Sequence, residues 1–201
     1  MIALTGKGHL ISNTCSLALL AVGFDAAVNH CDNTYVSDFA QNISEWCIPH
    51  ASITYAAIGL LLFYFGTLLP DCDNKNSILG KIMYVPVEHR TVTHAMWIPI
   101  GLFILSIIYR PLFCLVLGYV LHLLWDNLSK CGVCYFWPIS KYKYFGNSGA
   151  KIKKKHIFYL YRTSSSSEYV LLGILVMITI ILMCAYTYQN GLSYLSQYIQ
   201  L

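Results

Sequence analysis

Histidines and aspartates gather near the ends of several apolar segments in this chain of 201 residues. Ionisable side chains are costly at membrane depth, so those that occur there are candidates for a functional site. Imidazole nitrogen and carboxylate oxygen bind divalent metal ions, and a hydrolytic metal site leaves one position for water. We assign metal binding to seven residues: His9, Asp71, Asp73, His89, His94, His122 and Asp126.

The spacing within these residues favours a shared site. His122 and Asp126 are four residues apart and would share one face of a helix. A structural clamp held by a hydrogen bond is the other interpretation of this pair. Asp71 and Asp73 follow Pro70, which is not expected within a continuing helix, and a turn there could aim both carboxylates at one point. That pair could also simply end a helix.

The segment 88–94 adds a fixed positive charge to this set. Arg90 and His94 would share one helical face, with His89 about half a turn away. Because a guanidinium does not readily lose its charge, we expect Arg90 to bind an anionic group of the substrate, such as a phosphoester. Its alternative role is to anchor the third span on the cytosolic side.

The ligand set is larger than one ion needs. It suits either two metal ions, or one ion whose imidazoles are oriented by further carboxylates. Zinc is the expected cofactor, with manganese or magnesium as alternatives. A bound metal lowers the pKa of its water towards neutrality, and Asp73 or Asp126 would then act as the general base. Our predicted catalytic residues are therefore Asp73, Asp126 and Arg90.

The composition indicates a membrane protein. Only 11% of the residues are charged, against about 25% in an average soluble domain, and 57% are hydrophobic. So few charges could not cover that much apolar surface in water. The pI near 8.6 would suit a nucleic-acid partner. The basic residues stand where a membrane protein needs them, however, so we expect lipids and no nucleic acid as partners.

The predicted fold is an all-α polytopic membrane bundle of about five transmembrane helices. The predicted spans are Leu10–Val28, Pro49–Leu69, Val92–Tyr109, Pro111–Leu128 and Tyr169–Tyr188. A short re-entrant or interfacial segment, Gly132–Pro138, is expected after the fourth. Residues 1–201 would form a single membrane domain with three parts: the core 5–140, a basic cytosolic loop 141–167, and the last span with an outer tail, 168–201.

Lysine and arginine set the expected orientation. Eight of them lie in the loop 130–162, and Lys75, Lys81 and Arg90 lie between the second and third spans. The segment 29–48 has none. Since cytosolic loops are rich in these residues, we expect a multi-pass protein of a bacterial inner membrane, with a cytosolic amino terminus and an outer carboxyl terminus. Four spans then bring their His or Asp residues to the cytosolic face.

The cysteines and the remaining histidines carry weaker signals. Cys31 and Cys47 would face an oxidising compartment, where they could form a disulfide or remain free thiols. Cys131 and Cys134 form a CxxC that could be half a zinc site or a redox pair, but no second CxxC completes it. We interpret the other histidines as ordinary polar residues; they are His30, His50 and His156.

Five motifs together resemble one known family. They are Thr5–His9, Leu69–Asp73, His89–His94, Gly118–Asp126 and Trp137–Pro138. In this order they are similar to the YdjM-like membrane-bound metal-dependent hydrolases, a family of bacterial inner-membrane proteins. The resemblance implies that the family's His, Asp and Arg positions fall on His9, Asp71, Asp73, His89, Arg90, His94, His122 and Asp126. The chain departs from the family pattern at Asn74, Glu88, Ala95 and Ser129, the first of which replaces a frequent His and leaves one or two ions open.

The sequence thus predicts a membrane metal-dependent hydrolase that acts on a phosphoester or lipid-linked substrate at the cytosolic membrane face. The alternative is a protein that binds or transports ions, or has a structural role, without catalysis. A transporter would place polar groups near the bilayer midplane, whereas those of this chain cluster at one end of the spans.

Overall fold

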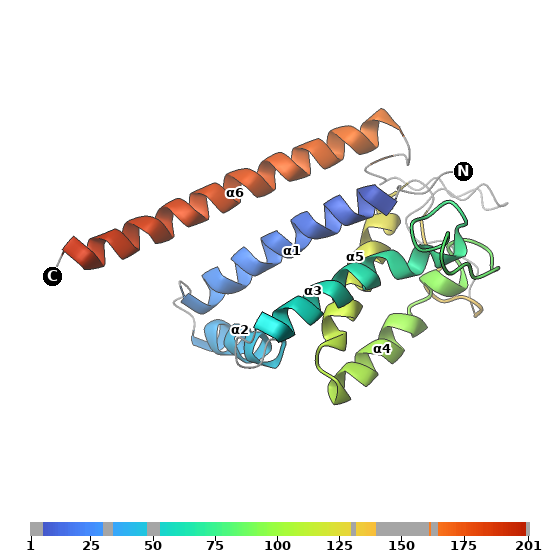
Figure 1. Ribbon diagram of the computed structural model, residues 1–201, viewed down its shortest axis with the longest axis horizontal. Coiled ribbons are helices and arrows are strands. Elements are labelled where there is room, and N and C mark those ends of the chain that lie inside the picture. Colours follow the sequence, from blue (N-terminus) through green and yellow to red (C-terminus); the bar gives the residue numbers. More distant parts are fainter. Residues whose placement is uncertain are drawn as a thin grey trace.

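The computed structural model describes residues 6–29, 34–47, 53–129, 132–139, 161 and 165–199. This part of the chain is built from helices, so the predicted all-α class is confirmed (Figure 1). The α-helices are α1 (Gly6–Asn29), α2 (Thr34–Cys47), α3 (Ile53–Leu68), α4 (Trp97–Ile108), α5 (Leu112–Asn127) and α6 (Ser166–Ile199). Two short 3-10 helices, η2 (Leu69–Asp73) and η3 (Val92–His94), lie between α3 and α4.

Three helical segments are long and apolar enough to cross a bilayer: Lys7–Val28, Ile53–Asp73 and Ser166–Asn190. Each corresponds to a span expected from the sequence. An α-helix rises 1.5 Å per residue, so the 22 residues of the first segment reach about 33 Å, which covers a hydrocarbon core of about 30 Å.

The other two apolar helices are shorter than the expected spans. α4 has 12 residues and α5 has 16, so they reach about 18 Å and about 24 Å. The third span was expected to start at Val92, but its α-helix starts at Trp97. The residues Val92–His94 instead form the 3-10 turn η3, in which Thr93 and His94 are buried. The carbonyl oxygen of Val92 accepts from the backbone N–H of Ala95 at 3.1 Å, and the carbonyl oxygen of Thr93 accepts from the hydroxyl of Tyr119 on α5.

Helices α3 and α5 pack closely because each has a glycine where it contacts the other: Gly66 on α3 and Gly118 on α5. A Cβ atom on Gly66 would lie 2.1 Å from the carbonyl oxygen of Leu115. A Cβ atom on Gly118 would lie 2.1 Å from the carbonyl oxygen of Phe63. Small residues that allow two backbones to approach are typical of helix contacts in membranes. This contact holds the end of α3, and η2 after it, beside the last turns of α5.

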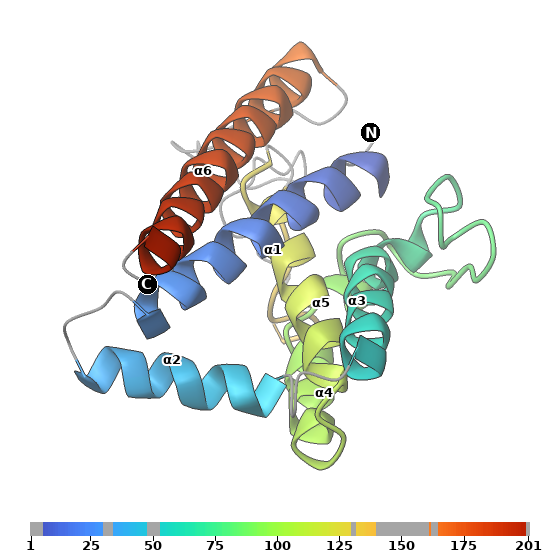
Figure 2. The same ribbon diagram turned by 60° about the vertical axis from the view of Figure 1, so that its left-hand side comes forward.

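The start of α1 and the end of α3 lie at the same end of the helix bundle. α1 and α6 lie side by side and run in the same direction, while α3 runs the opposite way, so α1 starts and α3 ends at the same end of the bundle (Figure 1). α2 crosses near the other end, as Figure 2 shows. α2 was not predicted from the sequence, although apolar residues recur every three to four positions from Val36 onwards. That spacing indicates an amphipathic helix.

The segment after α5 packs against the start of α4. The backbone N–H of Met96 donates to the carbonyl oxygen of Tyr135 at 2.9 Å, and Trp97 Nε1 donates to the carbonyl oxygen of Trp137 at 3.0 Å. Val133 is fully buried. Several sequence predictions fall outside the described residues, or on a side chain that is not described: those for His30, Cys31, Cys47, His50, Cys131, His156 and most of the basic loop.

Candidate metal centre

Six buried side chains from four parts of the chain meet at the shared end of the helices. η2 supplies Asp71 and Asp73, η3 supplies His94, α5 supplies His122 and Asp126, and α1 supplies His9. None of the six is more than 4% exposed. The helix α5 presents its pair on one face, as the four-residue spacing predicted. The α-helix α3 ends at Leu68 before Pro70, which also follows the prediction.

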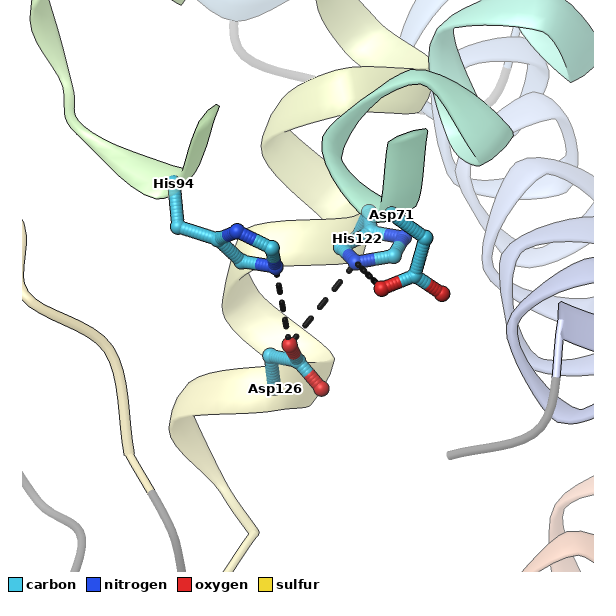
Figure 3. Close-up of side chains that lie close together, drawn as sticks. All are labelled: Asp71, His94, His122 and Asp126. Carbon is cyan, nitrogen blue, oxygen red and sulfur yellow. Dashed lines mark ion pairs between the residues drawn. The ribbon is translucent and has the colours of Figure 1, made fainter. Parts of the chain in front are cut away.

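Four of these side chains form a compact group: Asp71, His94, His122 and Asp126 (Figure 3). One nitrogen or oxygen atom from each lies within 4.8 Å of the others. Asp126 Oδ2 is 3.2 Å from His94 Nε2 and 3.7 Å from His122 Nε2. Two ligand atoms on one tetrahedral ion at about 2.0–2.2 Å lie about 3.3–3.6 Å apart. The spacing of the group therefore fits ligands around a single ion.

The tautomer of His122 decides what its ring offers to this group. His122 Nδ1 lies 2.7 Å from the carbonyl oxygen of Thr67, which can only accept a hydrogen bond, so Nδ1 carries the proton. In the neutral ring Nε2 then has a lone pair. It faces Asp71 Oδ1 at 3.7 Å and Asp126 Oδ2 at 3.7 Å, two carboxylate oxygens that also carry lone pairs. A lone pair directed at two carboxylates is unfavourable unless a cation or a shared proton lies between them.

The polar atoms that face this point have no hydrogen bond within the described part of the chain. They are Asp71 Oδ1, His94 Nε2, His122 Nε2 and Asp126 Oδ2. A buried polar group without a partner costs about 1–3 kcal/mol, and more when it is charged. His94 Nε2 and Asp126 Oδ2 pair with each other only when His94 carries a proton, so one divalent cation at this point would satisfy all four atoms. The residues present thus fit a divalent metal ion.

His94 connects this group to a second carboxylate. Its Nε2 faces Asp126, while its Nδ1 lies 3.6 Å from Asp73 Oδ2 and 3.0 Å from Thr93 Oγ1. Burial by itself would lower the pKa of His94, but the nearby carboxylates of Asp126 and Asp73 outweigh it and raise the pKa to about 9. At neutral pH a proton on His94 and a metal ion beside it are therefore competing ways to neutralise these carboxylates.

Asp73 is occupied by hydrogen bonds. Its Oδ1 lies 2.6 Å from His89 Nδ1, and its Oδ2 accepts from the backbone N–H of Arg90 at 3.2 Å and from the hydroxyl of Thr93. Asp73, His89 and His94 also lie close enough to hold an ion together. The 2.6 Å contact, however, is shorter than the separation of two ligands on one ion, so a hydrogen bond explains it better.

Arg90 is a buried partner of Asp126. Its guanidinium donates to Asp126 Oδ1 at 2.6 Å, to Ser129 Oγ at 2.9 Å and to the carbonyl oxygen of Gly132 at 3.4 Å. Arg90 also has a φ of 66°, a left-handed conformation that is uncommon for a residue with a side chain. The expected helical spacing from Arg90 to His94 is therefore wrong: a turn, and not a helix, brings the two together.

His9 covers one side of the group. Its ring stacks on that of His122, with centroids 3.7 Å apart and planes 16° apart. Its Nε2 lies 3.3 Å from Asp126 Oδ1, the oxygen that also accepts from Arg90. His89 differs from the other site residues because 27% of its side chain is exposed. The structure thus brings all seven predicted ligands together, in an inner group of four with His9, Asp73 and His89 around it.

Sequence reasoning missed the polar residues that support the group. Asn13 Nδ2 donates to Thr67 Oγ1 and to the carbonyl oxygen of Gly118, each at 3.0 Å, and so ties α1 to α3 and α5. Asn13 stands within an apolar span, one turn from His9, and that position was a usable signal. Thr93 and Ser129, which bond Asp73 and Arg90, had no comparable signal in the sequence.

Comparison with known proteins identifies the family. Residues 5–191 match the family model described as YdjM inner membrane protein. The chain belongs to this family. Searches of the curated proteins and of the solved structures give no match. The family resemblance expected from the motifs is therefore confirmed, and so is membership of an inner-membrane family, whereas catalysis and orientation stay predictions.

Proposed function

We propose that this protein is a metal-dependent hydrolase whose buried His/Asp centre lies at the cytosolic end of its helices. The observation that carries this proposal is the position of His122 Nε2, which lies 3.7 Å from Asp71 Oδ1 and 3.7 Å from Asp126 Oδ2. His94 completes the set with a second nitrogen. Two imidazoles and two carboxylates are a donor set suited to zinc, with manganese as the next choice.

We assign one ion to this centre. Asp73 and His89 lie next to this centre and do not bind the ion. Asp73 forms a hydrogen bond with His89 and lies beside Nδ1 of His94, which is a ligand. Carboxylates that orient metal-binding imidazoles in this way commonly increase metal affinity by about 10–100-fold. The replacement of the family's frequent His by Asn74 agrees with a single ion.

We assign a separate role in hydrolysis to each residue around the centre. A divalent ion bound there supplies a Lewis acid for hydrolysis. His89 is the site residue that reaches solvent, and its Nδ1 is held by Asp73. Its Nε2 is itself buried and has no hydrogen bond within the described residues, so it would take a proton from a water inside the centre, with Asp73 holding Nδ1 on the other side of the ring. Arg90 fixes Asp126. To bind an anionic substrate group it would exchange one of its present contacts for that group.

The position of the site favours a substrate at the membrane surface. The four ligands lie where α3 has just ended and where α5 is about to end, so they are level with one end of the bundle (Figure 1). A phosphoester in a lipid headgroup, or a phosphate linked to a lipid, would reach that level from the bilayer. Arg90 in the centre, together with Lys75 and Lys81 on the segment between η2 and η3, suits an anionic substrate.

The proposed topology has five crossings, with the amino terminus in the cytosol. The hairpin of α4 and α5 begins and ends at the site, and Arg110 lies exposed at its turn. An arginine at the bilayer centre is costly, so the turn is best placed at the outer interface. The short segment after α5 would then lie at the cytosolic interface. The site faces the same side whether the hairpin crosses fully or not.

A non-catalytic metal site is the second candidate. The four inner ligands are each at most 2% exposed, and a closed set of four protein ligands is typical of structural zinc sites. A hydrolytic site must open one position to water and substrate. Such a protein would bind the same ion with the same residues, but it would turn over no substrate.

The test combines metal analysis with hydrolysis assays on purified protein in nanodiscs. Wild type, His94→Ala and Asp71→Ala would be compared with Asp38→Ala, which removes an exposed carboxylate of α2. The proposal predicts bound metal and phosphoester hydrolysis in wild type and Asp38→Ala, and loss of both in the site variants. Metal without turnover of any lipid phosphoester would instead establish the structural site. Wild-type protein without metal would overturn both.

A further inference from the structure

The loop between η2 and η3 has a defined internal structure. Ser77 Oγ donates to the carbonyl oxygen of Asp71 at 2.7 Å and accepts from the backbone N–H of Gly80 at 2.8 Å. The backbone N–H groups of Ile82 and Met83 both donate to the carbonyl oxygen of Leu79, at 2.9 Å and 2.8 Å. This loop, residues 74–87, extends beyond the end of α3 (Figure 2).

The tip of the loop presents apolar side chains outwards. Ile82 is 78% exposed and Met83 is 55% exposed, and they stand beside Tyr84, Val85 and Ile78, which are also exposed. Local hydrogen bonds hold the backbone of residues 77–83, directly before and within this tip. Contiguous exposed apolar side chains on an ordered loop indicate a contact with an apolar environment.

We propose that this loop inserts its tip into the cytosolic interface of the bilayer and that its lysines bind anionic lipid headgroups. The loop leaves the end of a candidate span at Asp73 and returns to the apolar helix α4, so both its ends stand at the bilayer surface. At that place the tip can reach the acyl boundary with a short displacement. Aromatic and apolar side chains with basic neighbours are the usual composition of such interfacial segments.

The positive charges near the tip favour lipids with anionic headgroups. Lys75 and Lys81 are both exposed, and Lys75 Nζ lies 4.9 Å from the ring centroid of Tyr84. A lysine near a negatively charged leaflet contributes about fivefold in binding, the equivalent of about 1 kcal/mol. Glu88 is the one acidic side chain of the segment 74–88, and it follows the tip towards His89. The loop therefore favours phosphatidylglycerol or a similar anionic lipid over phosphatidylcholine.

The loop is joined directly to the metal centre. The backbone N–H of Val85 donates to the carbonyl oxygen of Cys72 at 3.0 Å, between the two aspartates of η2. Ser77 bonds the carbonyl group of Asp71 in the same way. Insertion of the tip would thus place headgroups beside the residues that hold the centre. The inference of membrane contact itself does not depend on whether the centre is catalytic.

A photoreactive diazirine amino acid at position 82 tests this proposal in the full-length protein. The protein is placed in nanodiscs of phosphatidylglycerol and phosphatidylcholine in equal amounts, illuminated and digested, and the adducts of the loop peptide are identified by mass. Position 76 is the matched control, because Asn76 is exposed on the same loop but polar and, next to Lys75, would lie at the level of the hydrated headgroups. Metal content is measured on the same samples.

The expected result is lipid adducts at position 82 and mainly water adducts at position 76. Phosphatidylglycerol should exceed phosphatidylcholine among the lipid adducts, and each of Lys75→Gln and Lys81→Gln should reduce that ratio by about fivefold. Water adducts at position 82, or crosslinks to a protein chain, would overturn the proposal. Because lipid adducts require no bound metal, the metal content separates this outcome from a failure of the proposed hydrolase.

Discussion

The replacement of Gly118 by alanine tests how packing positions the metal centre. The new Cβ atom would lie 2.1 Å from the carbonyl oxygen of Phe63, whereas ordinary contact begins at 3.4 Å. α3 and α5 must therefore separate locally by the difference, about 1.3 Å, because both clashing groups belong to helix backbones. Overpacking of this kind typically costs about 1–3 kcal/mol of stability.

The separation of α3 and α5 should also lower the affinity of the centre for metal. His122 lies one turn after Gly118 on α5, and its Nδ1 bonds the carbonyl oxygen of Thr67 on α3 at 2.7 Å. An opening of about 1.3 Å stretches this bond beyond the usual limit of about 3.2 Å. Loss of such an orienting bond lowers metal affinity by about 10–100-fold. Gly118→Ala is therefore expected to bind metal at least tenfold more weakly than wild type.

Gly101→Ala provides the matched control for this assay. A Cβ atom on Gly101, in α4, would meet nothing within 4 Å. Removing a helical glycine there should leave stability unchanged or raise it by up to about 1 kcal/mol. Metal affinity would be measured by competition with a chelator, and stability by titration with SDS. If Gly118→Ala bound metal as tightly as Gly101→Ala, the link between the helix contact and the centre would be refuted.

Two further substitutions test the polar support of the centre. Arg90→Gln breaks a buried pair with Asp126 and should lower the free energy of unfolding by about 3–5 kcal/mol, whereas Lys81→Gln, at an exposed position, should change it by less than about 0.5 kcal/mol. Equal effects in SDS titration would argue against the buried pair. Asn13→Ala removes the hydrogen bond to Thr67 and should cost about 1–3 kcal/mol while leaving the ratio of metal to protein unchanged, because Asn13 contacts no ligand atom in the described part of the chain. Loss of the metal in that variant would show that Asn13 belongs to the centre itself.

The candidate ligands could be predicted from the sequence because they lie at the ends of apolar segments. Imidazoles and carboxylates at the ends of apolar segments have few ordinary explanations, and the four-residue spacing of His122 and Asp126 survives directly in α5. Pro70 correctly marked the end of the α-helix α3. These signals are local: each depends on a few neighbouring residues and on the cost of ionisable groups in an apolar segment.

Which of these residues bind the ion, and which only position other residues, could not be predicted in this way. Whether Asp73 binds an ion or holds His89 depends on a distance of 2.6 Å between residues that are 16 positions apart. The left-handed turn at Arg90 likewise depends on its buried contacts with Asp126 and Ser129. A helical spacing was assumed for Arg90 and His94, and the tertiary contacts override it.

The helix boundaries show the same limit. The sequence predicts that the third span begins at Val92, yet Val92–His94 form a separate turn that buries His94 in the centre. Helix α2 was not expected because its segment is polar and follows a break in the apolar pattern. The amphipathic spacing of Val36, Phe39 and Ile43 is the feature of the sequence that indicates this helix.

The most direct test of the central claim is the metal content of wild-type protein purified without chelators, measured by mass spectrometry alongside His122→Ala. If His122 Nε2, Asp71 and Asp126 surround a cation, wild type should carry about one zinc or manganese ion per chain and the variant should carry almost none. Wild-type protein that is folded and free of transition metal, or a variant that retains the full complement, would contradict the account.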